Sequence, residues 1–185
     1  MTPSQAALAL LLVLSSGTVL WADEQSSANE LRAEFVLTFP EFVEWPVPPD
    51  KPDEAGAFRV GVIGDDPILH SLGKLAPARR IRGRPVIVRK IAGVKDVGDC
   101  DLLFISSSEK EAVPRIVSMT MHKPILTVGN TTGYARLGVH INLYRFENYY
   151  RFEVCLPGAR DSGLRISAKL LKLAKVFDDG EGKSR

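Results

Sequence analysis

Four short apolar segments in the middle of the chain constrain the fold more than any other feature of the sequence. They are FRVGVIG (58–64), RPVIVRKI (84–91), DLLFI (101–105) and PILTV (124–128). Their apolar residues are nearly continuous, which is typical of strands buried on both faces of a parallel sheet. Segments with helical patterns separate them, so the sequence predicts an α/β fold with helices on both faces of the sheet.

The C-terminal part of the chain has a different pattern. Residues 139–146 and 150–156 are rich in β-branched and aromatic side chains and lie close together, which predicts an antiparallel hairpin. Apolar and basic residues intermingle over 164–177, as in an amphipathic helix. We therefore expect a three-layer α/β sandwich with a largely parallel sheet, a C-terminal antiparallel hairpin and a closing amphipathic helix. The tail, 178–185, has little to bury and should fray.

Two helix starts are visible in the sequence. Asp66 follows the first strand and precedes Pro67, the order expected of an N-cap residue and the first residue of a helix. Ser108 and Glu111 have the spacing of a capping box, which predicts a helix over 108–119.

An aromatic stripe lies in the N-terminal segment, 29–45. The spacing of Phe35, Phe39 and Phe42 places them on one face of a helix, and Pro40 predicts a kink or a new turn. Such a stripe is either part of the core or, beside the proline-rich and acidic loop expected over 46–57, a docking patch that ends in Trp45.

The first 22 residues have the pattern of an export signal. An apolar run, 6–14, is too short to cross a bilayer, and Leu20 and Ala22 suit the positions before a signal-peptidase cleavage site. The alternative is an anchor that stays attached. Cleavage after Ala22 leaves one domain, 23–185, with no further segment of membrane length, in an exported compartment that lacks ATP, NAD and histidine-kinase phosphate.

The net charge of +2 lacks the basic surplus typical of nucleic acid binding. Two cysteines, Cys100 and Cys155, allow one intramolecular disulfide in an oxidising compartment. Both are expected near the same edge of the sheet. One intervening strand would already prevent the bond, so strand order decides whether they pair.

Small polar residues follow three of the expected strands, at 64–66, 106–109 and 129–133. The loops after parallel strands meet at one edge of a sheet and line a crevice there. The same residue types also cap helices and form tight turns. The candidate surface for a ligand or partner therefore comprises two groups, the loop residues and the aromatic terminus: Asp65, Asp66, Ser107, Asn130 and Trp45.

Motifs of several enzyme and cofactor classes are incomplete. The turn at Gly61 and Gly64 lacks a full phosphate-binding pattern, and its two acids would repel a phosphate. The third strand ends in Ser106, not in the aspartate of a receiver domain. The three histidines are widely spaced and no Gly-x-Ser-x-Gly elbow occurs. We expect no catalytic residue, no cofactor and no metal.

Several motifs resemble the YfiR-like family of exported bacterial proteins. They are FPEFVEWP (39–46), FRVGVIGDDP (58–67), CDLLFISSSE (100–109), ILTV (125–128), GYA (133–135), IN (141–142), RFE (151–153) and GLRISAKLL (163–171). The resemblance follows the chain in order over about 31–176.

This resemblance implies a noncatalytic and commonly dimeric α/β protein. The family's namesake is a periplasmic repressor that holds the sensing region of an inner-membrane diguanylate cyclase inactive, which lowers cyclic-di-GMP signalling and biofilm formation. The implied partner here is an inner-membrane sensor protein, either a cyclase or a kinase. This chain differs from the namesake in two respects. It has only two cysteines, whereas disulfides contribute to the behaviour of the namesake, and Pro40 stands where family members usually continue the N-terminal helix. A small-ligand carrier or sensor that uses Asp65, Ser107 and Asn130 is the alternative.

Overall fold

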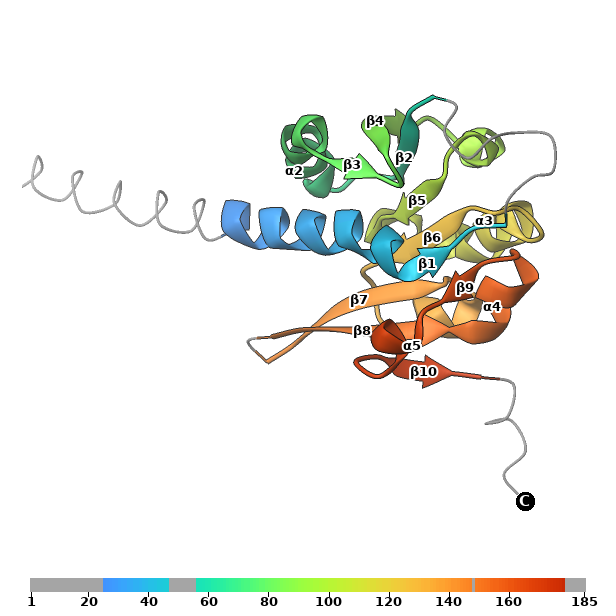
Figure 1. Cartoon of the computed structure of the whole chain (residues 1–185). Helices are drawn as coiled ribbons and strands as arrows, with labels where there is room; N and C mark the ends of the chain where they lie inside the picture. Colours follow the sequence, from blue (N-terminus) through green and yellow to red (C-terminus); the bar gives the residue numbers. More distant parts are fainter. Residues whose placement is uncertain (1–24, 47–55, 148, 179–185) are drawn as a thin grey trace, which may run out of the picture.

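An eight-stranded sheet forms the centre of the computed structural model, which describes residues 25–46, 56–147 and 149–178. The strand order is β10-β8-β7-β6-β5-β2-β4-β3, from the lower to the upper end in Figure 1. The strands from β7 to β4 run parallel, whereas β8 is antiparallel to β7 and β3 to β4. Their bounds are β2 (Phe58–Ile63), β3 (Arg80–Ile81), β4 (Arg84–Ile91), β5 (Leu102–Ile105), β6 (Leu126–Gly129), β7 (Ile141–Phe146), β8 (Tyr149–Cys155) and β10 (Lys175–Phe177).

Helical elements cover both faces of this sheet. The N-terminal helix, described from residue 25 to 38, and α2 (Ile68–Leu75) pack on one face with the side chains of Val60 and Phe104. On the other face lie η3 (Val94–Asp99), α3 (Val113–Thr120) and η5 (Tyr134–Leu137), which pack with Leu103 and Ile105. The expected three-layer α/β fold with a largely parallel sheet is therefore confirmed.

The central strands explain why their sequences are continuously apolar. Every residue of β5 and β6 is buried, and alternate side chains of β5 enter the two separate hydrophobic clusters. A strand covered on both faces has no position where a polar side chain could reach water. The four expected strands and the β7–β8 hairpin are confirmed, with ends that differ by one or two residues.

Pro40 ends the N-terminal helix as the sequence predicts. The chain passes at Phe39 into the short 3-10 helix η1 (Phe39–Phe42), with the proline in its first turn, and then into β1 (Val43–Glu44). A proline can occupy a first helical turn because the amide hydrogen that it lacks would have no partner there. β1 pairs with β9 (Arg165–Ile166), so the N-terminal segment is joined to the C-terminal part of the chain.

The expected capping box at Ser108 is wrong. The helical segment begins with η4 (Ser107–Ala112), whose N-cap, Ser106, lies two residues before the expected one, and α3 follows with Pro114 in its first turn. The hydroxyl of Ser106 accepts a hydrogen bond from the Ser108 backbone at 3.3 Å. Ser108 instead uses its hydroxyl to accept a bond from the Asp65 backbone at 2.9 Å. Tertiary contact with the neighbouring loop thus overrides the local capping pattern.

The expected closing helix over 164–177 is also wrong, since only α5 (Ala168–Leu171) is helical there. Strand β9 precedes it and β10 follows it, with Lys175–Phe177 parallel to Glu153–Cys155 of β8. Without β10, this part of β8 would form the outer edge of the sheet, and pairing satisfies its backbone groups. α4 (Leu156–Asp161) connects β8 with this segment.

Cys100 and Cys155 are both buried and are not joined by a disulfide. β6 and β7 lie between β5, which begins just after Cys100, and β8, which ends at Cys155. Three strand intervals separate the two positions by roughly 14 Å, far beyond the reach of a disulfide. The pairing left open by the sequence is therefore excluded in this fold. Burial raises the pKa of the Cys100 thiol to about 12, and its Sγ donates to the Val97 carbonyl at 3.2 Å.

Three expectations concern residues that the structure does not describe. The undescribed residues include the leader, 1–22, the central part of the loop expected over 46–57, and the tail after Asp178. Asp178 itself is described and forms an ion pair with Arg160 at 2.9 Å.

Candidate functional site

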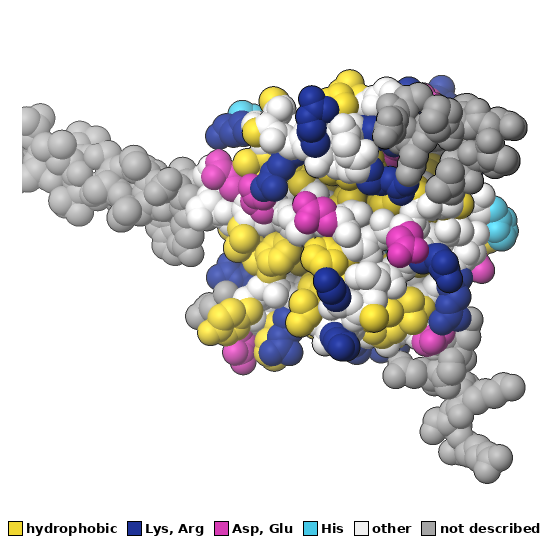
Figure 2. All heavy atoms as spheres, viewed as in Figure 1, with side chains coloured by type: hydrophobic (Ala, Val, Ile, Leu, Met, Phe, Trp, Pro, Cys, Tyr) yellow, Lys and Arg dark blue, Asp and Glu magenta, His cyan; other side chains and the backbone are white. Residues whose placement is uncertain are grey.

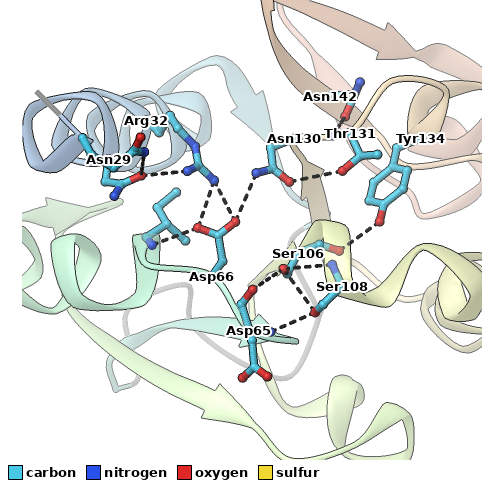
Figure 3. Close-up of polar contacts among 12 residues, drawn as sticks. Asn29, Arg32, Asp65, Asp66, Ser106, Ser108, Asn130, Thr131, Tyr134 and Asn142 are labelled. Carbon is cyan, nitrogen blue, oxygen red and sulfur yellow. Dashed lines mark hydrogen bonds and ion pairs between the residues drawn. The ribbon is translucent and has the colours of Figure 1, made fainter. Parts of the chain in front are cut away.

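Three loops that follow parallel strands meet at one edge of the sheet. We call residues 64–67, 106–108 and 130–134 the polar loop cluster (Figure 3). The Ser106 hydroxyl donates to the Asp65 carbonyl at 2.8 Å, and the Tyr134 hydroxyl donates to the Ser106 carbonyl at 2.9 Å. Parallel strand ends thus bring together loops that are far apart in the sequence.

Gly64 allows the first two loops to approach each other. Its φ of +86° lies in the left-handed region, which disfavours other residues. A Cβ at this position would collide with the side chains of Ser108 and Glu109. The glycine is therefore explained by the close approach of two loops, with no need for a bound phosphate.

Asp66 is the most buried charge of the polar loop cluster, with only 6% of its side chain exposed. Its carboxylate accepts bonds from the Arg32 guanidinium at 2.8 and 3.0 Å and from the Ile68 backbone at 2.9 Å. The Asn130 amide donates to it at 3.1 Å. These donors occupy the carboxylate, so Asp66 caps α2, as expected, and anchors two other segments instead of facing a ligand.

Arg32 is a central residue of this network that sequence reasoning missed. It lies on the N-terminal helix with 12% of its side chain exposed, and it also donates to the Asn29 side chain at 2.9 Å. Asn29 and Arg32 are three residues apart, so they share a helix face with the buried Val36. Two polar residues on an otherwise buried face were the available signal for a buried partner.

Asp65 and Ser107 form the exposed part of the cluster. The Asp65 carboxylate is 86% exposed and pairs with Lys90 at 2.5 Å, and Ser107 also faces solvent. The hydrogen bond and the positive charge of Lys90 hold the pKa of Asp65 below its usual value. The structure therefore divides the expected loop residues into an internal pair, Asp66 and Asn130, and an exposed pair.

Trp45 lies at the opposite edge of the sheet from these loops. Its Nε1 donates to the Pro124 carbonyl, just before β6, at 2.8 Å. Its ring meets the Phe58 ring edge-on at 5.8 Å, and the Arg82 guanidinium lies 5.2 Å from its centroid. The five residues proposed from the sequence thus belong to two separate regions.

The aromatic stripe contributes mostly to the core. Phe39 is buried and contacts Phe152 edge-on at 5.5 Å, whereas Phe35 and Tyr150 are partly buried and lie 6.0 Å apart. The stripe attaches the N-terminal helix to β8 and leaves part of Phe35 accessible at the surface.

His140 and Ser162 form a buried polar contact that the sequence analysis did not anticipate. The Ser162 hydroxyl lies 3.2 Å from His140 Nε2, and Nδ1 accepts a bond from the Thr127 backbone at 3.2 Å. Because Nδ1 accepts, the proton of the neutral ring lies on Nε2 and points to Ser162. Burial lowers the pKa of His140 to about 4. Both side chains are buried, so this contact is structural and lacks the access that a nucleophile needs.

The described residues contain no group of three or more His, Cys, Asp or Glu side chains that could hold a metal ion. Among the helices in the described ranges, none is long and apolar enough to span a membrane.

The sequence matches the YfiR/HmsC-like family over residues 29–175, which includes every strand of the sheet except the last two residues of β10. The chain belongs to this family. Its members are periplasmic regulators of cyclic-di-GMP signalling. No curated protein gave a significant match.

A solved structure has the same fold. It is the conserved domain protein from Vibrio cholerae O1 biovar El Tor strain N16961, with 14% identity and a TM-score of 0.52. The similarity covers 81% of this chain and 60% of that chain. The chain thus spans less than two thirds of that protein's length, and the likeness concerns the fold alone.

Proposed function

We propose that this chain is a periplasmic repressor that binds the exported sensing domain of an inner-membrane diguanylate cyclase and lowers its output. Family membership over 29–175 is the observation that carries the proposal. In this proposal the leader, 1–22, is removed after Ala22, and the mature domain acts by contact, as a homodimer.

The geometry of the polar loop cluster favours a contact function over a small-ligand sensor. Asp66 binds both Arg32 and Asn130, so Asp66 and Asn130 are committed to holding the loops. Asp65 and Ser107 are exposed on the rim of the cluster and can meet a partner without rearrangement. A sensor for a small polar ligand would instead need convergent, unoccupied polar groups in a hollow.

Deletion and site-specific crosslinking test the proposal in cells. Loss of a repressor should raise cyclic-di-GMP, and expression of the chain should restore the original level. A photocrosslinking residue in place of Ser107 should capture a membrane protein with a cyclase domain, whereas the same residue in place of the exposed Ile87 on β4 should not. An unchanged cyclic-di-GMP level after deletion, with no membrane protein captured at Ser107, would contradict both repression and binding.

A further inference from the structure

Exposed apolar and basic side chains gather at the β10 end of the sheet. We call Phe146, Tyr149, Arg151, Lys169, Lys172, Leu173 and Lys175 the β10-edge surface. Figure 1 places α5, β10 and the hairpin of β7 and β8 at this end, and Figure 2 shows basic side chains interspersed with apolar ones there. Leu173 is 76% exposed, Tyr149 69% and Phe146 45%. Three of the most exposed large apolar residues of the described chain thus share one end of the molecule.

The local fold leaves these side chains exposed at the outer edge of the sheet. α5 buries Leu170 against the core. Lys172 and Leu173 follow Lys169 by three and four positions, so all three residues lie on the opposite, exposed side of this turn. β10 pairs with β8 only at Glu153–Cys155, so the outer side of β8 is unpaired from Tyr149 to Phe152. The turn lies on the face of the sheet that holds Phe152, whereas Tyr149 and Arg151 point to the other face, so the two groups border the outer edge of the sheet from its two sides.

The charges of this edge are largely unneutralised. Within the described residues, Lys169 and Lys172 form no ion pair, and Lys175 approaches Glu153 only at 3.8 Å. Arg151 lies 4.7 Å from the centroid of Phe146, a cation–π contact that leaves its charge in place. Exposed acids nearby include Glu147, at the hairpin turn, and Asp178, which follows β10 and pairs with Arg160 at 2.9 Å.

The opposite end of the sheet shows that a basic composition alone does not produce such a surface. There, Arg79 pairs with Glu34, and Arg84 pairs with Asp101 at 3.0 Å. Lys74 approaches Glu30 at 3.6 Å. Acidic partners thus compensate these three cations, whereas the β10 edge keeps a net positive charge.

We propose that the β10-edge surface binds the surface of an anionic phospholipid bilayer. Lysines attract the lipid headgroups, and single protruding side chains such as Leu173 and Tyr149 enter the interface between headgroups and acyl chains. A flat and mainly apolar patch would favour a protein partner, but here the apolar side chains protrude singly between cations. Binding of this kind is peripheral and would hold a regulator beside a membrane protein. The proposal does not depend on the identity of that protein.

Vesicle co-sedimentation of the purified mature chain tests the proposal without any protein partner. We expect binding to phosphatidylcholine vesicles that contain a quarter phosphatidylglycerol, little binding to pure phosphatidylcholine, and release by 0.5 M NaCl. Each lysine near an anionic surface contributes about fivefold to affinity. The double variant Lys169→Glu with Lys172→Glu should therefore bind at least about 25-fold more weakly.

A charge-matched control separates a local effect from net charge. Lys95→Glu with Lys110→Glu changes two exposed lysines on η3 and η4 by the same amount, and binding should stay within about twofold of the original protein. Equal losses in the two double variants would overturn the proposal, as would equal binding to both kinds of vesicle.

Fluorescence gives a second readout that does not depend on charge reversal. In a Trp45→Phe background, Leu173→Trp should show a blue shift of its emission when anionic vesicles are added. Ile87 is 55% exposed and lies near the other end of the sheet, so Ile87→Trp should show no such shift. If Leu173→Trp shifts only with an extract of membrane proteins and not with lipid vesicles, the surface is a protein-binding site and the lipid proposal is wrong.

Discussion

The polar loop cluster and the β10-edge surface both carry charged residues, but Asp66 in the cluster and the lysines at the edge are used in opposite ways. In the cluster, Asp66 is enclosed by donors from the N-terminal helix, α2 and the loop after β6. At the β10 edge, lysines and apolar side chains project into solvent. Substitutions of the internal Asp66 should change stability, and substitutions at the β10 edge should change binding. Whether a charged side chain is enclosed by internal hydrogen bonds or exposed to solvent therefore indicates its role here better than the type of residue does.

Replacement of Asp66 should produce the largest change in stability. Asp66→Ala removes the partner of the buried Arg32 and should lower the free energy of unfolding by about 3–5 kcal/mol. Urea denaturation followed by circular dichroism measures this loss. The neighbouring Asp65→Ala affects only an exposed contact with Lys90 and should leave the denaturation midpoint unchanged.

A double variant tests whether the Asp66 effect arises from an unpaired charge. Arg32→Met with Asp66→Leu removes both charges and should lose less stability than Asp66→Ala alone. An equal loss in Asp65→Ala and Asp66→Ala would remove the distinction between internal and exposed residues of the cluster.

His140 predicts acid sensitivity at a buried polar contact. Its folded pKa of about 4 lies below the ordinary value of 6.5, so the unfolded state binds more protons between these values. Stability should fall by about 3 kcal/mol as the pH is lowered from 6.5 to 4, and this contribution should stop changing below the folded pKa. Denaturation midpoints measured across this range should vary less steeply in His140→Asn. The same slope in both proteins would assign the acid sensitivity to other groups.

Trp45→Phe should have a smaller effect. It removes the hydrogen bond from Nε1 to the Pro124 carbonyl but keeps an aromatic ring against Phe58. We expect a loss of about 1 kcal/mol, measurable by chemical denaturation. Trp45→Ala should cost more because the ring is also removed. If Trp45→Phe were neutral while it abolished cyclase repression in cells, Trp45 would be a partner contact and not an internal anchor.

Lys172→Glu should have the smallest effect on folding. The side chain is exposed, so the free energy of unfolding should change by less than about 0.5 kcal/mol while vesicle binding weakens. A large loss of stability in thermal unfolding would show that Lys172 stabilises the fold. The β10 edge would then affect stability as well as binding, as the polar loop cluster does.

The parallel core could be predicted from the sequence because local patterns determine it. Continuous apolar runs identified β2, β4, β5 and β6, and the position of loops after parallel strands brought Asp65, Ser107 and Asn130 to one edge. This geometry follows from strand direction alone. Whether these residues bind a partner remains the proposal stated above.

Other features depend on contacts between distant segments and could not be predicted in the same way. Arg32 lies 34 residues before Asp66, and nothing in the local sequence identifies that partner. The apolar residues of the segment over 164–177 have helical spacing. In the fold, however, its first part pairs with β1 as β9 and its last part pairs with β8 as β10. Strand order likewise decided that Cys100 and Cys155 stay apart.

The pairing of β1 with β9 has a consequence for the order in which the protein assembles. Val43 lies opposite Ile166, so one of the first segments to be synthesised needs one of the last. Phe39 likewise packs against Phe152. Closing such long loops slows folding, and a chain released from its N-terminus onward cannot complete these contacts until the C-terminal part has emerged. This part of the fold is therefore completed only after the N-terminal and C-terminal segments have come together.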